Sequence, residues 1–192
     1  YVVCQFLSSE INRRTDSYGG SPANRARLLN EIIEGIRARC DPDFIVGVRL
    51  SPERFGMQLS EITELAQELM ASPHLDFLDM SLWDSFKEPA EEQYQGRSLL
   101  SYFTELERGN VRLGVAGNIW TPADAERVMS QGVDWVMLGR VAIVHHDFPN
   151  RYHQDRNFTP LSLPVTRQHL ASEGLSERFL HYMGARPGFI AD

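Results

Sequence analysis

Cysteine is scarce in this sequence, which has only Cys4 and Cys40 among its 192 residues. Two cysteines are too few for a disulfide framework, and they lack the spacing of a metal site. An excess of positive charge is also missing, because the formal net charge is −7. This balance gives no support to a surface for nucleic acid or for an anionic membrane. We expect neither of these partners and no metal.

Long apolar runs are absent as well, and none approaches the length that crosses a bilayer. No signal-peptide pattern opens the chain, so we expect a cytoplasmic protein. A first methionine is missing, since the sequence begins at Tyr1 within an apolar segment. We therefore expect the chain to be part of a longer protein.

Four apolar segments with the character of strands alternate with helical patterns. The strands begin near Phe44, Leu75, Val111 and Val133. Helices are predicted from Ser21-Pro22 to about Cys40, from a cap at Ser60 through Leu69, from Gly96 to Arg108, and from a cap at Thr121 to Gly132. This alternation favours a parallel sheet built from βαβ units. Four such units make either half of an eight-fold barrel or a small open α/β sheet.

The remaining residues predict a helical tail. Residues from Leu163 to Gly184 have the pattern of two short helices separated at Gly174-Leu175-Ser176, and the final RPGFIAD is predicted as loop. Before the tail, His145 and His146 are adjacent, so a regular element would point them apart. We expect a loop or the start of a helix there, and not a shared metal ligand pair.

A phosphate site is suggested where the last two predicted strands end. Gly117-Asn118 follows one strand and Gly139-Arg140 follows the next. Glycines let backbone N–H groups approach an anion, and arginine adds a fixed charge with forked donors. The loops after strands seven and eight of a (β/α)8 barrel commonly bind phosphate. Ordinary turn chemistry explains each glycine equally well, so the pattern alone leaves both interpretations open.

Polar residues near two other strand ends are further candidates. Arg49 ends an apolar strand and is costly to bury without an anionic partner, which is either a carboxylate or a ligand. Trp83, Asp84 and Lys87 follow the next strand. They line the mouth of a pocket or form an exposed loop.

The N-terminal segment resembles a family signature. The stretch YVVCQFLSSEINRRTDSYGGSPANRARLL is similar to the signature of the Old Yellow Enzyme family of FMN-dependent NAD(P)H:flavin oxidoreductases, or ene-reductases. FIVGVRLSP, LGVAGNI and VDWVMLGRVAI match the later strands of that family in the same order. The resemblance implies an α/β fold that is the second half, strands five to eight, of a (β/α)8 TIM barrel whose N-terminal half is missing. Residues 1–192 would be part of one FMN-binding domain, with barrel units over about 1–149 and a helical tail over 150–192.

The resemblance also implies roles for particular residues. Tyr1 stands where the family has its proton-donating tyrosine, and Arg49 matches the arginine at the N1 and O2 edge of the flavin. The FMN phosphate would be held by Gly117, Asn118, Gly139 and Arg140. The signature residues between Asn12 and Gly20 are expected mainly to tie a hydrogen-bonded loop to the barrel.

The implied function is an FMN-dependent oxidoreductase. It would take electrons from NADH or NADPH and reduce activated alkenes or related electron-poor small molecules. The alternatives are an inactive proteolytic or truncated half-barrel, and another phosphate-binding barrel enzyme such as an isomerase or aldolase. Possible partners are the missing N-terminal half and a second copy in a homodimer, in which Tyr182 or Arg186 would reach the neighbour's active site.

Overall fold

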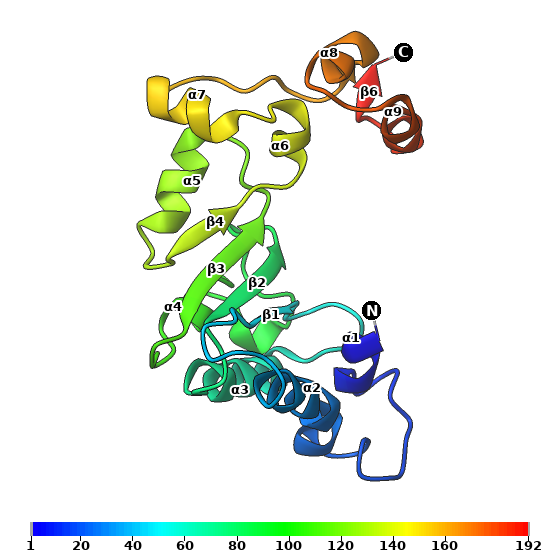
Figure 1. Cartoon of the computed structure of the whole chain (residues 1–192), viewed down its shortest axis with the longest axis vertical. Coiled ribbons are helices and arrows are strands. Elements are labelled where there is room, and N and C mark those ends of the chain that lie inside the picture. The colour runs from blue at the N-terminus through cyan, green and yellow to red at the C-terminus, as the bar shows by residue number, and fades with distance from the viewer. Residues whose placement is uncertain (1, 192) are drawn as a thin grey trace.

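The computed structural model describes residues 2–191, and its centre is a four-stranded parallel sheet with the strands in chain order (Figure 1). The strands are β1 (Gly47–Leu50), β2 (Phe77–Trp83), β3 (Arg112–Gly117) and β4 (Trp135–Met137). Helices α2 (Pro22–Arg37), α3 (Leu59–Met70), α4 (Ser101–Thr104) and α5 (Pro122–Met129) precede them in turn. The parallel sheet of βα units predicted from the sequence is confirmed. Tyr1, the predicted proton donor, lies outside the described residues.

The two faces of the sheet differ in chemistry. One face packs against the helices and supplies the core through apolar side chains: Val48, Leu50, Leu78, Met80, Leu82, Leu113 and Val115. The alternate residues lie on the other face, where the register aligns Arg49 with Asp79 and Asp79 with Gly114. Near the start of the strands, the rings of Phe77 and Trp135 meet edge to face with centroids 5.4 Å apart.

Glycine is required beneath these two rings. A Cβ at Gly47 would lie 2.1 Å from the Phe77 ring, and a Cβ at Gly114 would lie 2.3 Å from the Trp135 ring. No side chain fits at such distances, so the aromatic pair fills the space over both glycines. The polar residues of this face are thereby gathered toward the carboxyl ends of the strands.

Local capping signals account for most helix starts. Ser21 accepts a hydrogen bond from the Asn24 N–H, and Thr121 accepts one from the Asp124 N–H, so both caps predicted from the sequence are confirmed. The Asp124 side chain also accepts from the Thr121 N–H, which completes a capping box. The predicted cap at Ser60 is wrong, since α3 begins at Leu59. There the Glu91 carboxylate, 2.7 Å away, accepts the Leu59 N–H and replaces a local cap.

The predicted helix from Gly96 to Arg108 is also wrong in extent, because α4 covers only Ser101–Thr104. Gly96 has a φ of +98°, and the Leu99 N–H is bonded to the Lys87 carbonyl instead of to a helical partner. Leu99 is one of the apolar residues whose spacing predicted the helix, and it is buried although it lies in a loop. A one-turn 3₁₀ helix, η1 (Glu92–Tyr94), precedes Gly96 in the chain.

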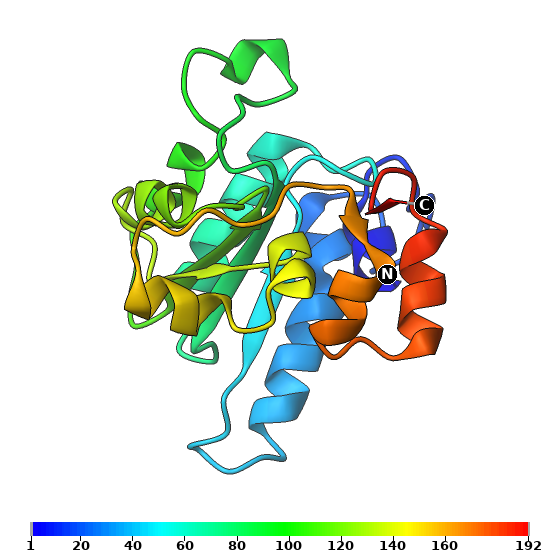
Figure 2. The same ribbon diagram turned by 90° about the horizontal axis from the view of Figure 1, so that it is seen from above.

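The C-terminal part forms its own small core. It comprises α6 (Arg140–Val144), α7 (Phe148–Gln154), β5 (Val165–Thr166), α8 (Arg167–Ser172), α9 (Glu177–Gly184) and β6 (Ile190–Ala191). Figure 1 shows α8, α9 and β6 grouped beside one another away from the sheet, and Figure 2 shows the same grouping from above. Their core consists of Val144, Val165, Leu170, Leu180, Met183 and Phe189.

The tail confirms one prediction and corrects another. The two short helices are present, and Gly174 between them has a φ of +88°. The last residues are not all loop, since Ile190 and Ala191 pair in parallel with Val165 and Thr166. His145 and His146 lie in the loop between α6 and α7, as expected. No helix of the described part is long and apolar enough to cross a membrane.

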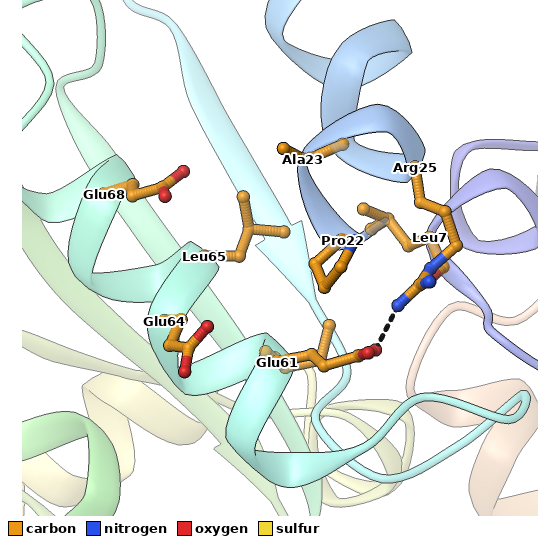
Figure 3. A pocket seen from close by; sticks show the side chains of 10 residues that line it. Leu7, Pro22, Ala23, Arg25, Glu61, Glu64, Leu65 and Glu68 are labelled. Carbon is orange, nitrogen blue, oxygen red and sulfur yellow. Dashed lines mark hydrogen bonds and ion pairs between the residues drawn. The ribbon is translucent and has the colours of Figure 1, made fainter. Parts of the chain in front are cut away.

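At the N-terminus, the signature loop is tied to helices by hydrogen bonds. The Asn12 side chain donates to the carbonyls of Phe6 and Tyr18, at 2.7 Å each. Arg25 of α2 is buried, donates to the Leu7 carbonyl, and pairs with Glu61 of α3 (Figure 3). The loop joins α1 (Val2–Leu7), α2 and α3 into one unit, in agreement with the structural role expected for the signature.

Candidate functional site

A cavity of about 690 Å³ lies where the carboxyl ends of the strands meet the tail. All the residues predicted to bind the cofactor line it: Arg49, Gly117, Asn118, Gly139 and Arg140. The sequence placed these residues after three different strands, and the parallel topology brings their ends together. The structure thus unites them around one space.

Arg49 is held in place by two polar neighbours on β2. Its Nη1 atom lies 3.1 Å from the Asp79 carboxylate, and its Nη2 atom donates to Ser81 Oγ at 3.0 Å. The Asp79 side chain is only 3% exposed, whereas that of Arg49 is 52% exposed. Burial raises the pKa of the Asp79 carboxyl, although the Arg49 charge opposes the shift. A carboxylate partner is therefore present, and the guanidinium still faces the cavity.

The turns after β3 and β4 are joined by side chains. Arg140 Nη2 donates to Asn118 Oδ1 at 2.8 Å, and the Asn118 amide nitrogen donates to Asp84 Oδ2 at 3.1 Å. Asn118 has a φ of +50°, a conformation that asparagine tolerates better than most residues. Asn118 thereby fixes the direction of the Arg140 guanidinium.

The two glycines of these turns serve different purposes. A Cβ at Gly117 would lie 3.0 Å from both the backbone nitrogen and Oγ of Ser85, so the loop after β2 needs this position to stay small. Gly139 has φ −101° and ψ −99°, outside the main regions open to other residues. A Cβ there would meet no protein atom within 4 Å, so the space beside Gly139 is open.

Several lining residues were not found from the sequence. They are Ser81, Ala116, Ile119, Trp120 and Met137 from the sheet side, and Leu163, Pro187, Gly188 and Phe189 from the tail. Trp83, for which the sequence left both a pocket mouth and an exposed loop open, lines the cavity. Arg186 lines the cavity of its own chain and donates to the Tyr182 hydroxyl at 2.7 Å. Its contact with a neighbouring copy stays a prediction. The β5–β6 pairing brings the tail here, and such a two-residue ladder leaves no periodic signal.

The cavity is electropositive although the chain is acidic. Its lining includes Arg49, Arg140 and Arg186 and contains no Asp or Glu among the described residues. The formal net charge of the chain is −7. A concave site lined by one sign of charge focuses its field, so this cavity favours an anionic ligand.

A second cluster of titratable groups lies between α6, α7 and α8. Glu173 is buried, accepts from the His146 backbone and ring at 2.9 and 2.6 Å, and lies 3.4 Å from Arg151. Burial raises the pKa of Glu173, but the hydrogen bonds from His146 outweigh it and lower the pKa overall. His145, 4.0 Å from this carboxylate, has a pKa lowered by burial and by the Arg151 charge.

The geometry of this cluster fits an ion-pair network better than a metal centre. His145, His169 and Glu173 offer atoms within 4.8 Å of one another. However, His145 Nε2 accepts the Leu161 N–H at 2.9 Å, which places the proton of the neutral ring on Nδ1, the nitrogen nearer Glu173. A protonated nitrogen cannot ligate a metal. The Arg151 guanidinium, which lies 3.4 Å from Glu173, would also compete with a metal ion for this carboxylate.

Comparison with known proteins identifies the family. A family model described as the NADH:flavin oxidoreductase / NADH oxidase family matches residues 1–158. Because the match covers most of the chain, the chain belongs to this family, and the resemblance to Old Yellow Enzyme proteins is confirmed. This membership argues against an isomerase or aldolase barrel.

The relatives are substantially longer than this chain. Cinnamate reductase of Clostridium sporogenes is 29% identical over an alignment of 178 residues, and the match covers 81% of this chain and 27% of the relative. A putative 12-oxophytodienoate reductase-like protein of Arabidopsis thaliana is 31% identical over 157 residues, covering 79% and 47%. The structure of morphinone reductase in complex with tetrahydroNAD matches with a TM-score of 0.63 and 28% identity, covering 87% and 43%. The chain therefore spans less than half the length of these relatives, and its sheet matches part of their barrel.

Proposed function

We propose that this chain is the second half, strands five to eight, of the TIM barrel of an FMN-dependent oxidoreductase, and that it carries the phosphate-binding turns. Bound FMN would supply hydride transfer, with NADH or NADPH as the electron donor and an activated alkene or related electron-poor compound as the acceptor. The observation that carries the proposal is the Arg140–Asn118 pair, which joins two adjacent strand ends inside an electropositive cavity.

The residues at these turns suit a phosphate group. Arg140 offers forked donors, and Asn118 holds it in one orientation. The open space beside Gly139 lets an anion approach the backbone N–H groups of the turn. No carboxylate lines the cavity in the described part of the chain, and the nearby Asp84 carboxylate accepts a hydrogen bond from the Asn118 amide nitrogen.

Arg49 suits the other end of the cofactor. We assign Arg49 to the pyrimidine edge of the flavin ring, where a permanent cation would stabilise the negative charge of the reduced flavin. Asp79 and Ser81 anchor its guanidinium from one side, and the exposed side faces the cavity. Proton donation to the substrate is assigned to Tyr1, whose phenol would keep its proton at neutral pH until carbanion character develops.

A titration with paired ligands tests the proposal. FMN and riboflavin differ only in the phosphate, so the ratio of their dissociation constants isolates the phosphate site. Arg140→Ala removes a charged hydrogen-bond donor, which contributes about 1.5–3 kcal/mol. FMN affinity should fall by roughly 10- to 150-fold, while riboflavin affinity stays the same.

Arg39→Ala is the matched control, since Arg39 follows the end of α2, donates to the Gly35 carbonyl and is not among the residues that line the cavity. It should leave both affinities unchanged. Equal losses of FMN and riboflavin affinity in Arg140→Ala would show that Arg140 does not hold the phosphate.

A further inference from the structure

Three neighbouring strand ends are connected by hydrogen bonds at the carboxyl edge of the sheet. β2, β3 and β4 lie side by side in this order (Figure 1). Directly after β2, the Ser85 N–H donates to the Gly117 carbonyl at 3.0 Å. A Cβ at Gly117 would also lie 3.1 Å from the Asp84 backbone nitrogen. The loop after β2 therefore lies against the turn that contains Gly117 and Asn118.

The Asp84 side chain uses both of its carboxylate oxygens. Oδ1 accepts the Phe86 N–H at 2.8 Å, and Oδ2 accepts from the Asn118 amide nitrogen at 3.1 Å. The first bond spans two residues, and by such a bond an aspartate fixes its own side chain in a turn. The second bond is consequently made by a carboxylate of defined position. Both partners belong to the described residues, so these contacts depend on no segment outside them.

Hydrogen-bond polarity allows only one orientation of the Asn118 amide. An ionised carboxylate only accepts hydrogen bonds, and a guanidinium only donates them. The amide nitrogen must therefore face Asp84, and the amide oxygen must face Arg140, whose Nη2 atom lies 2.8 Å away. A flipped amide would oppose two acceptors at one end and two donors at the other. The carboxylate at one end thus determines which atom is presented to the guanidinium at the other end.

We propose that Asp84 is a positioning residue of the phosphate site, which orients the Arg140 guanidinium through the Asn118 amide. The proposal rests on the proposed function, in which Arg140 holds the FMN phosphate. The bond to Asn118 occupies one of five guanidinium donors, so others remain for the phosphate oxygens. Asp84 itself is not among the residues that line the cavity. The positioning role accounts for a negative charge close to an anion site, where a carboxylate alone would weaken binding.

Asp84→Asn tests the orientation with little change in shape. The new amide oxygen can still accept the Phe86 N–H, which leaves the new NH2 group facing the NH2 group of Asn118. Asn118 pairs again only by flipping, and it then turns its own NH2 group toward Arg140. The substitution also removes a negative charge near the phosphate, which by itself would strengthen FMN binding. The two effects are separated by repeating the substitution in the Arg140→Ala background.

The affinities for FMN and riboflavin are measured for the parent chain, the two single variants and the double variant. The preference for FMN over riboflavin reports the phosphate alone, and the comparison between the two backgrounds cancels the direct effect of the Asp84 charge. Without Arg140, Asp84→Asn should raise this preference slightly or leave it unchanged. With Arg140 present, the same substitution should be less favourable by about three- to ten-fold, as expected for one lost hydrogen bond.

Asp155→Asn is the matched control. Asp155 accepts the Asn157 N–H at 2.9 Å, which is the same two-residue bond, and it does not line the cavity. The substitution removes the same charge and should leave the affinities for both flavins unchanged.

NMR of the flavin-free chain supplies an independent readout. The side-chain ¹⁵N signals of Arg140 report how freely its guanidinium rotates. Rotation should become faster in Asp84→Asn, because the flipped amide no longer accepts from Arg140. It should slow again when Asn118→Asp is added, since a carboxylate at position 118 accepts from both neighbours. Aspartate tolerates the positive φ of this position, which is +50°.

These readouts distinguish failure of the positioning role from failure of the proposed function. Unchanged Arg140 rotation in Asp84→Asn, or an equal effect of this substitution on the flavin preference in the two backgrounds, would overturn the positioning role. A preference of the parent chain for FMN would then leave the cofactor site standing. Faster rotation that Asn118→Asp reverses, in a chain that binds neither flavin, would support the positioning role and contradict the proposed function. A lower Tm of Asp84→Asn with unchanged rotation and flavin preference would show that Asp84 only stabilises its loop.

Discussion

Replacing Arg25 with methionine should be among the most destabilising single changes in this chain. The Arg25 side chain is 6% exposed and donates to the carbonyls of Leu7 and Gly20 and to Glu61, whose carboxylate is 2.5 Å away. Methionine preserves much of the volume but leaves the two carbonyls and the carboxylate without this partner. Removing one member of a buried ion pair costs about 3–5 kcal/mol. Glu61 is 21% exposed and so regains some solvation, which favours the lower end, about 3 kcal/mol.

Urea unfolding followed by tryptophan fluorescence measures this loss directly. The midpoint should fall with an unchanged m value, and the Tm should drop by about 6–12 °C for a domain of this size. Arg27→Met is the matched control, because Arg27 lies on the exposed side of the same helix and donates to the Ser17 carbonyl at 2.7 Å. Its cost should stay below about 1 kcal/mol. Equal losses for the two variants would refute the argument, and Glu61→Met added to Arg25→Met should recover part of the loss.

Two further predictions concern local packing and pH. Gly117→Ala should cost about 1–3 kcal/mol in unfolding free energy and weaken FMN binding, because the new Cβ would press on Ser85 at 3.0 Å. Gly184→Ala, at the end of α9 with no atom within 4 Å of the new Cβ, should be neutral or stabilising in the same assay. Burial lowers the pKa of His145, so its stabilising contribution is complete above the usual histidine pKa of about 6.5 and declines as pH falls below it. His145→Gln, which keeps an acceptor for the Leu161 N–H, should flatten the Tm profile below pH 6.5; an unchanged slope would remove His145 as its cause.

Local signals in the sequence were sufficient for the elements that they directly control. Thr121 followed by proline predicted the start of α5, and the apolar runs predicted all strands of the central sheet. The helix expected from Gly96 to Arg108 is shorter than predicted, because Leu99 lies in a loop in which its N–H donates to the distant Lys87 carbonyl. The hydrophobic pattern of a sequence indicates which residues are buried, but it does not show whether those residues lie in a helix or in a loop.

The same distinction applies to the cavity. Its glycine-ended turns were visible in the sequence because parallel strands bring their carboxyl ends together whatever the details of packing. The partner of Arg49 could be predicted only as a carboxylate, and the register of β1 on β2 was needed to identify Asp79. The place of Arg186 in the cavity depends on the pairing of β5 with β6, which no short pattern encodes.

The measurement that tests the central claim most directly is the affinity of the unsubstituted chain for FMN and riboflavin, followed by quenching of flavin fluorescence. A phosphate site formed by the turns after β3 and β4 predicts that FMN binds at least about ten-fold more tightly than riboflavin. The difference should shrink as inorganic phosphate is added, because phosphate competes for Arg140 and the adjoining turn. Equal affinities for the two flavins, or no binding of either, would contradict the account.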